Sequence, residues 1–277
     1  MSLLSVDNLV VEYPVATGTF RAVDGVSFSV DKGETLAIVG ESGCGKSTIA
    51  KAIVRLVAPT SGQILVDGVD IAHMKELALR PFRSRVQMVF QDPYGSLDPH
   101  LTAVDIVGEP LRLKGVRNKA DRHKRASELI DQVQLPASSR NRRPGEFSGG
   151  QRQRIGIARA LASEPEILVC DEATSALDVS VQAQVLELLR TIQSDTGITY
   201  IFISHNLGVV REISNNVVVM RKGALVEHGS TASVLADPQH PYTAALRAAA
   251  LDPTTMEGVK PRYVLSGRRA PIKQGMS

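Results

Sequence analysis

Cysteine is scarce in this 277-residue sequence, and long apolar runs and a strong charge of one sign are missing. The two cysteines, Cys44 and Cys170, lie far apart, so neither a disulfide framework nor a cysteine-based metal site is expected, and a reducing compartment fits. The histidines are scattered without metal-ligand spacing. No apolar run approaches the roughly 20 residues that span a bilayer, so we expect any membrane role to be peripheral. The first residues lack the basic and apolar regions of a signal peptide.

The formal net charge of +3 is too small to indicate a nucleic-acid-binding protein by itself. Basic residues do cluster locally, because residues 114–143 hold nine Lys or Arg against three Asp or Glu, and residues 260–273 are also basic. A solvated helical face is the simpler interpretation of the longer cluster. A position near anionic lipid headgroups is the alternative.

Apolar strands alternate with helical patterns along the chain, an order typical of an α/β fold with a mainly parallel sheet covered on both faces. The first 40 residues read as strands and are expected to form an N-terminal antiparallel β subdomain, and residues 92–160, mostly helical in pattern, are expected to form a subdomain inserted into the core. Helices are expected at 46–57 and along the apolar stripe 181–192, the second of them ending near Gly197. Strands are expected at 3–13, 22–30, 35–39, 63–66, 86–90, 167–170 and 198–203, followed by a hairpin of 217–220 with 224–227.

Residues 40–48 fit the pattern G-x-x-x-x-G-K-[ST] between a predicted strand and a predicted helix. The glycines let backbone N–H groups approach phosphate oxygens, and the helix N-terminus adds positive potential. Lys46 supplies a charge for the β- and γ-phosphates of ATP, and Ser47 supplies a hydroxyl for Mg²⁺. A plain glycine-rich turn is the alternative, which the flanking strand and helix disfavour. The predicted nucleotide-binding residues here are Gly40, Glu41, Ser42, Gly43, Cys44, Gly45, Lys46, Ser47 and Thr48.

Cys44 lies in this loop beside a helix N-terminus, a position that favours a thiolate. We therefore expect Cys44 to be alkylated readily and MgATP to protect it. A catalytic role for this thiol is not expected, because no base is implied nearby.

Two carboxylates follow the apolar segment 167–170. Because charges at the carboxyl end of a parallel strand lie at the ligand crevice, Asp171 is predicted to hold Mg²⁺ and Glu172 to polarise the attacking water. His205 follows another apolar strand and is predicted to contact the γ-phosphate, and Gln91, at the end of 86–90, can reach Mg²⁺ or the water. A surface acidic pair, a capping histidine and a neutral strand-end glutamine are the simpler interpretations, which a preceding phosphate loop disfavours.

A second candidate anion site lies at residues 147–151, Phe-Ser-Gly-Gly-Gln, at the start of a predicted helix. Ser148 and the N–H groups of Gly149 and Gly150 are its donors. Together with the phosphate loop, this stretch resembles the signature of the ATP-binding cassette (ABC) family, with Phe147 in place of the commoner Leu. The resemblance covers roughly residues 3–250.

The resemblance implies that two cassettes pair head to tail, each ATP lying between one phosphate loop and the partner's signature, residues Ser148, Gly149, Gly150 and Gln151. Tyr13 matches the aromatic that stacks on adenine, and residues 175–178, ending in Asp178, match the loop that crosses to the partner site. One nucleotide-binding domain is therefore expected over 1–250, followed by an irregular basic tail at 251–277.

Residues 89–99, 108–111 and 237–246 are similar to the ATPases of dipeptide, oligopeptide and nickel importers. In that branch, the stretch after Gln91 would contact a coupling helix of the permease, with Tyr94 and Leu97 as contacts. Many members continue into a cysteine-bearing tail that in some binds an iron–sulfur cluster. This sequence has no cysteine there, so no cluster is expected.

The resemblance implies an ATPase that uses ATP and Mg²⁺, whose dimer closure powers import of peptides or, alternatively, nickel or a related solute. The implied partners are two transmembrane permease subunits, a second and related ABC ATPase subunit, and an external solute-binding protein, with the chain at the cytoplasmic face of the membrane. Homodimer or heterodimer stays open, although the branch leans toward two different cassettes.

Two other classes are disfavoured. A cassette ATPase of nucleic acid or ribosomes would favour coiled-coil insertions or two cassettes in one chain, and the sequence has neither, so no nucleic-acid partner is expected. A non-hydrolysing regulatory cassette conflicts with the intact Lys46, Asp171, Glu172, Ser148 and His205.

Overall fold

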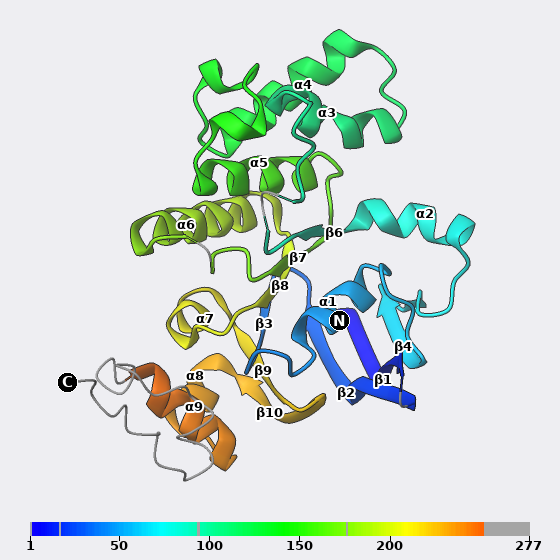
Figure 1. The fold of residues 1–277 in the computed structure, drawn as a ribbon, viewed down its shortest axis with the longest axis vertical. Helices are drawn as coiled ribbons and strands as arrows, with labels where there is room; N and C mark the ends of the chain where they lie inside the picture. Colours follow the sequence, from blue (N-terminus) through cyan, green and yellow to red (C-terminus); the bar gives the residue numbers. More distant parts are fainter. Residues whose placement is uncertain (1, 17, 93–94, 176, 252–277) are drawn as a thin grey trace, which may run out of the picture.

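The computed structural model describes residues 2–16, 18–92, 95–175 and 177–251, and within them the strands form two sheets (Figure 1). The first sheet is antiparallel, with strand order β2-β1-β4-β5. Its strands are β1 (Ser2–Val15), β2 (Gly18–Asp31), β4 (Ser61–Val66) and β5 (Val69–Asp70).

The second sheet has the strand order β10-β9-β3-β8-β7-β6, and all neighbours in it pair in parallel except β10 with β9. Its strands are β3 (Thr35–Gly40), β6 (Val86–Val89), β7 (Ile167–Asp171), β8 (Thr199–Ile203), β9 (Asn216–Arg221) and β10 (Ala224–Ser230). The predicted mainly parallel core, the N-terminal antiparallel sheet and the final hairpin are therefore confirmed.

The central strands β3, β7 and β8 are buried at every position, because both faces of the sheet are covered. Side chains alternate between the faces, so consecutive residues enter different cores. In β7, Leu168 and Cys170 join the core that contains the long helices, whereas Ile167 and Val169 join the core beneath the antiparallel sheet. The second sheet therefore contributes to both cores and connects them.

Helices cover the second sheet and its edges, and their arrangement can be followed in Figure 1. Helices α3, α4 and α5 pack together at one end of the molecule, far from β1 and β2, and α8 lies against β9 and β10. The helices are α1 (Lys46–Ile53), α2 (Glu76–Arg85), α3 (Ala103–Leu113), α4 (Lys119–Gln132), α5 (Gly149–Leu161), α6 (Val179–Thr196), α7 (Leu207–Ile213), α8 (Thr231–Ala236) and α9 (Pro241–Leu251).

Helix α4 follows directly from its sequence. Asn118 caps it by accepting a hydrogen bond from the N–H of Ala120, and Ala126, Leu129 and Ile130 fall on its buried face at helical spacing. These side chains belong to the same core as the strands β7 and β8. The helices α3 to α5 thus contribute to a core that they share with the sheet.

The basic stretch 114–143 lies largely on this helical region, and several of its cations are paired. Lys114 pairs with Glu164 at 3.1 Å, and Arg140 pairs with Asp131 at 2.7 Å. Ion pairs on this helical region therefore neutralise part of the local charge. No helix in the described part of the chain combines the length and apolar character needed to cross a membrane. Of the predicted tail at 251–277, residues 252–277 lie outside the described residues.

Candidate functional site

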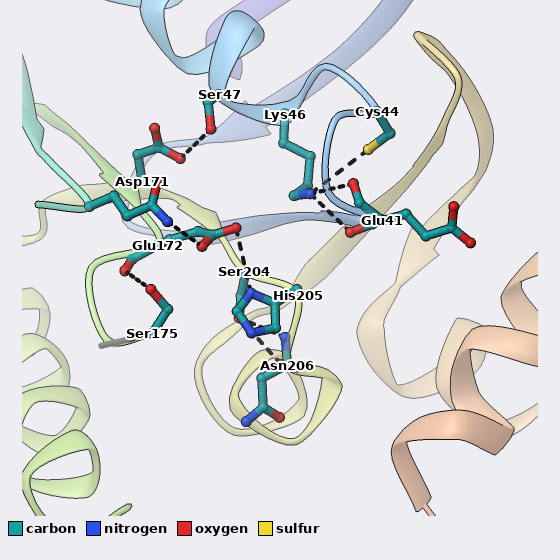
Figure 2. A network of polar contacts seen from close by, with 12 residues as sticks. Glu41, Cys44, Lys46, Ser47, Asp171, Glu172, Ser175, Ser204, His205 and Asn206 are labelled. Carbon is teal, nitrogen blue, oxygen red and sulfur yellow. Dashed lines mark hydrogen bonds and ion pairs between the residues drawn. The ribbon is translucent and has the colours of Figure 1, made fainter. Parts of the chain in front are cut away.

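Four neighbouring parallel strands carry the predicted site residues at their carboxyl ends. The strands lie in the order β3-β8-β7-β6, and the chain continues from them into Gly40, His205, Glu172 and Gln91, respectively. Because the strands are parallel, all four ends open at the same edge of the sheet. Segments separated by up to about 160 residues are thereby brought together, as Figure 2 shows for three of them.

The phosphate loop joins β3 to α1 and wraps around the side chain of Lys46. The lysine is only 4% exposed, and its Nζ donates to the carbonyl oxygens of Gly40 at 2.9 Å and Glu41 at 2.8 Å. The Sγ of Cys44 lies 3.9 Å from the same nitrogen. Figure 2 shows the ammonium group turned into the curve of the loop. The loop therefore holds a buried cation between β3 and the start of α1.

Two glycines allow the loop to pack this closely. Gly40 has φ 151°, and a Cβ there would overlap the carbonyl oxygen of Met220 on β9. Gly45 has φ 105° and forms the N-cap of α1, where a Cβ would overlap the carbonyl oxygen of Ala22 on β2. Both positions require glycine because backbone from another element occupies the space of a side chain.

Ser47 and Asp171 form the second part of the site. The Oγ of Ser47 donates to Oδ1 of Asp171 at 3.0 Å, which joins the first turn of α1 to the end of β7. Asp171 is 4% exposed, and burial raises the pKa of its carboxyl group, against the opposing effect of the hydrogen bond from Ser47. A bound cation would stabilise the carboxylate in this position.

Glu172 stands between Gln91 and His205. Its Oε2 accepts from Nε2 of Gln91 at 2.8 Å, and its Oε1 lies 3.5 Å from Nδ1 of His205. The backbone of Glu172 has φ 45°, an uncommon value for a non-glycine residue, and its carbonyl oxygen accepts from Oγ of Ser175. Figure 2 shows the carboxylate directed between Asp171 and the imidazole ring. Glu172 therefore contacts both of the other residues predicted for hydrolysis.

A cavity of about 340 Å³ is lined by Gln91 and Glu172, whereas Asp171 and His205 are not among its lining residues. Lys46, Gln91 and Glu172 line its floor, together with Ser42, Gly43, Gly45, Ser47 and Thr48 of the loop. Tyr13 of β1 lines the wall, as a residue that stacks on a base must. Phe20 of β2 lines the same wall opposite Tyr13 in the strand register and was not predicted from the sequence. Phe20 is 55% exposed, so its ring is accessible for stacking on a planar ligand.

The signature residues lie at the start of α5 and outside the lining of that cavity. The Oγ of Ser148 accepts from the N–H of Gln151, and the side chain of Gln151 accepts from the N–H of Ser148, a reciprocal cap. Gly150 packs against α6, where a Cβ would overlap Cγ1 of Val181. Phe147 is 4% exposed and packs in the core, so the Phe found in place of the commoner Leu is an apolar anchor.

Asp178 caps α6, with Oδ1 accepting from the N–H of Val181 at 2.9 Å. A hydrogen bond from Ser180, the largest effect, lowers the pKa of this exposed carboxyl group. Like the signature residues, Asp178 is not among the residues that line the cavity. One described chain therefore presents the phosphate loop and the helix start at 148–151 as separate surfaces, each with its own capping or packing role.

The prediction that Cys44 favours the thiolate is wrong. Its side chain is 5% exposed and belongs to the core beneath the antiparallel sheet. Burial raises the pKa of the thiol, and the nearby charge of Lys46 only partly opposes this effect. The free-energy cost of desolvating a thiolate here exceeds the stabilisation that the helix N-terminus provides.

Of the two predicted permease contacts, the structure contradicts one. Leu97 is 3% exposed and packs in the core with α3 and α5, so it is not available on the surface. Tyr94 lies outside the described residues, as does Ala176 in the segment 175–178.

Comparison with known proteins places this geometry in context. A family model described as ABC transporter matches residues 23–175. The Sinorhizobium fredii protein named "Probable peptide ABC transporter ATP-binding protein y4tS" is 51% identical over 256 residues, which cover 90% of this chain and 72% of that protein. The oligopeptide transport ATP-binding protein AppF of Bacillus subtilis is 50% identical over 242 residues, with coverage of 84% and 74%.

Solved structures agree with the fold. A dimeric post-hydrolysis form of the ATP-binding cassette MJ0796, bound to ADP and phosphate, superimposes with a TM-score of 0.76 at 30% identity, covering 82% of this chain and 98% of that one. CbiO1 of Clostridium perfringens, part of an ABC transporter complex, gives a TM-score of 0.75 at 27% identity, with coverage of 92% and 97%.

Proposed function

The chain belongs to the ABC transporter family, and we propose that it is the ATP-hydrolysing subunit of a peptide importer, acting at the cytoplasmic face of the membrane. The environment of Lys46 carries this proposal. Within the described residues, its buried ammonium group contacts two carbonyl oxygens and a thiol, and no carboxylate forms an ion pair with it. A buried cation without a counter-charge is costly, and the β- and γ-phosphates of ATP supply that charge.

The remaining donors suit the same ligand. The loop at 42–48 lines the cavity and leads into the N-terminus of α1, where backbone N–H groups favour an anion. Tyr13 and Phe20 give the opposite wall two aromatic rings for a purine base. The site therefore fits ATP from base to terminal phosphate.

Magnesium fits the donor set as well. Among the described residues, no group of three His, Cys, Asp or Glu side chains is able to hold a metal alone. Mg²⁺ is characteristically bound through one or two carboxylates together with substrate phosphates and water. Ser47 and Asp171, already joined by a hydrogen bond, would hold the ion, with Gln91 within reach. When bound, the ion neutralises phosphate charge and the charge of the buried Asp171.

Hydrolysis is assigned to Glu172. Its carboxylate lines the cavity and is fixed on one oxygen by Gln91, while the other oxygen faces His205. In this position Glu172 orients the attacking water and accepts its proton, and His205 contributes a ring nitrogen toward the terminal phosphate. The strained backbone at Glu172 turns its side chain from the line of β7 into the cavity.

A second cassette completes the site in this proposal. Residues 148–151 form an anion-binding helix start that lies away from the chain's own cavity, so its ligand would be the terminal phosphate of ATP held in the partner's phosphate loop. Leu177 packs next to Gly149, and the following residue, Asp178, caps the start of α6. Asp178 therefore lies on the same surface as the signature. Closure of two such cassettes on ATP, and opening after hydrolysis, provides the two states that move two permease subunits. The second cassette is proposed to be a related chain.

A groove of about 650 Å³ between α2 and α3 supports permease docking on one face. Leu113, 78% exposed, and Pro110 give it an apolar wall, and Glu76 and Arg80 give it a polar rim. Gln87 of β6 also lines it, and Gln91 follows at the end of that strand. The groove is therefore linked to the hydrolytic residues by a single short strand.

Peptides are the proposed cargo, delivered to the permeases by an external binding protein. The relatives that match over most of the chain carry peptide or oligopeptide transport names, which supports peptides over nickel. The test is uptake of labelled oligopeptides and of radioactive nickel by a deletion strain complemented with the wild-type chain or with Glu172→Gln. We expect wild type alone to restore peptide uptake. Restoration of nickel uptake only would overturn the peptide assignment.

A further inference from the structure

The phosphate loop has a contact with the far end of the chain. The N–H of Glu41 donates to the phenolic oxygen of Tyr242 at 3.0 Å, across 201 residues of sequence. Tyr242 lies at the start of α9, in the His-Pro-Tyr-Thr stretch that the sequence singled out only as a mark of a transporter branch. None of the hydrolytic roles described above uses this residue.

Tyr242 is held rigidly from several sides. It is 2% exposed and packs in a core cluster with Val39 of β3 and Val219 of β9. The guanidinium carbon of Arg221 lies 4.9 Å from its ring centroid, within range of a cation–π contact. Burial raises the pKa of Tyr242, so the hydroxyl stays protonated at neutral pH. The oxygen that meets the loop is therefore a fixed, neutral acceptor.

The segment that precedes Tyr242 is fastened to the sheet. The N–H groups of Gln239 and His240 donate to the two carboxylate oxygens of Glu227 on β10, at 2.8 and 3.1 Å. The N–H of Tyr242 then donates to Nδ1 of His240 at 3.1 Å. The position of the phenol is thus set by β10 through a short series of hydrogen bonds, and the loop is held against that frame.

One peptide plane joins this contact to Lys46. The N–H of Glu41 and the carbonyl of Gly40 belong to the same peptide unit and point in opposite directions from it. The N–H meets Tyr242, and the carbonyl oxygen accepts from Nζ of Lys46 at 2.9 Å. Any rotation of this unit that releases Tyr242 also moves the acceptor that holds the lysine.

We propose that Tyr242 is a positioning residue of the phosphate loop, which fixes the Gly40–Glu41 peptide plane so that Lys46 is held ready for the triphosphate. The inference rests on the proposed ATP-binding function and extends it to α9. Loss of the hydroxyl leaves the partly buried N–H of Glu41 without this acceptor and frees the plane to rotate. The consequence is weaker ATP binding at a nearly unchanged rate of turnover.

Tyr242→Phe tests this proposal in the purified full chain, because it removes a single oxygen. Tyr200→Phe is the matched control, since Tyr200 is 0% exposed and its hydroxyl donates to the carbonyl of Leu189, away from the loop. We expect Tyr242→Phe to raise the Kd for ATP about tenfold and, when turnover is assayed with the sibling cassette present, to raise the KM about tenfold with kcat within about twofold of wild type. Tyr200→Phe should lower the Tm while leaving the Kd for ATP unchanged.

The outcomes are distinguishable. If the wild-type chain fails to bind ATP, the proposed function fails. If wild type binds ATP and both tyrosine variants match it in Kd, or shift it equally, the positioning role is overturned. Hydrogen exchange of the wild-type chain without nucleotide needs no variant to fold. We expect the Glu41 amide to be protected relative to the exposed amide of Gly43, and equal exchange of the two would contradict the contact.

Discussion

The ammonium nitrogen of Lys46 lies 2.9 Å from the carbonyl oxygen of Gly40, six residues earlier in the same loop, and the lysine is 4% exposed. This closed arrangement keeps a cation out of water, and no carboxylate among the described residues forms an ion pair with it. In Lys46→Ala we expect the affinity for ATP to fall about a hundredfold, because a buried charge pair with phosphate is lost. Equilibrium binding of ATP to the full chain measures this loss.

The same variant should not lower the free energy of unfolding of the nucleotide-free chain, since it removes a buried cation that lacks a counter-charge. Lys75→Ala, at an exposed lysine before α2, is the control and should leave both the affinity and the stability unchanged. Wild-type affinity in Lys46→Ala would contradict the role of the loop.

The two signature glycines should respond differently to the same substitution. In Gly150→Ala the new Cβ overlaps Cγ1 of Val181, a stiff β-branched side chain on α6, so we expect a loss of about 1–3 kcal/mol in the free energy of unfolding. In Gly149→Ala the new Cβ lies 3.7 Å from Cδ2 of Leu177, an ordinary contact, so stability should be unchanged or slightly raised. Urea unfolding of both variants makes the comparison. Equal stabilities would show that α5 and α6 are less closely packed than described.

Cys44 should react slowly with iodoacetamide at neutral pH. Burial raises the pKa of its thiol, so the reactive thiolate is a minor form that grows as the pH rises. Cys170 is fully buried and its pKa is raised to about 12, so it should react more slowly still and serves as an internal reference. Peptide mass spectrometry over a pH series measures both rates. Labelling of Cys44 as fast as a small free thiol at neutral pH would contradict its burial.

The sequence was sufficient for the residues that carry local chemistry. Lys46 and Ser47 follow from one pattern of glycines, and Asp171 and Glu172 follow from charges that end an apolar strand. That these residues lie close together depends on the strand order, in which β8 lies between β3 and β7. Strand order is set by packing of the whole sheet, and no local pattern in the sequence specifies it.

Several features were beyond local patterns. Helix α2 contains Pro81 and buries only Leu79, so neither its composition nor its periodicity predicts a helix. Helix α1 ends at Ile53 rather than at Val57, with Arg55 at φ 55° shortly after it. Tertiary contacts outweigh the local helix preference both along α2 and at the end of α1.

The structure differs most clearly from the sequence predictions in the surroundings of individual side chains. Cys44 and Leu97 were placed by motif near a ligand or a partner, whereas the structure buries both in apolar cores. The sequence did not predict Phe20 as a site residue, because its position opposite Tyr13 depends on the register of β1 and β2, which shifts several times along the pair. Burial and register are properties of the folded chain that motif matching does not contain.

Glu172 offers the most direct test of the whole account. Glu172→Gln keeps the size of the side chain but removes the negative charge that meets Gln91 and His205. We expect ATP turnover to fall at least about a hundredfold, while ATP binds with wild-type affinity and shifts the chain, alone or with its sibling cassette, to a dimer in size-exclusion chromatography. Glu128→Gln, at an exposed glutamate of α4, is the control and should turn over normally. Undiminished turnover in Glu172→Gln would contradict the assignment of the hydrolytic site.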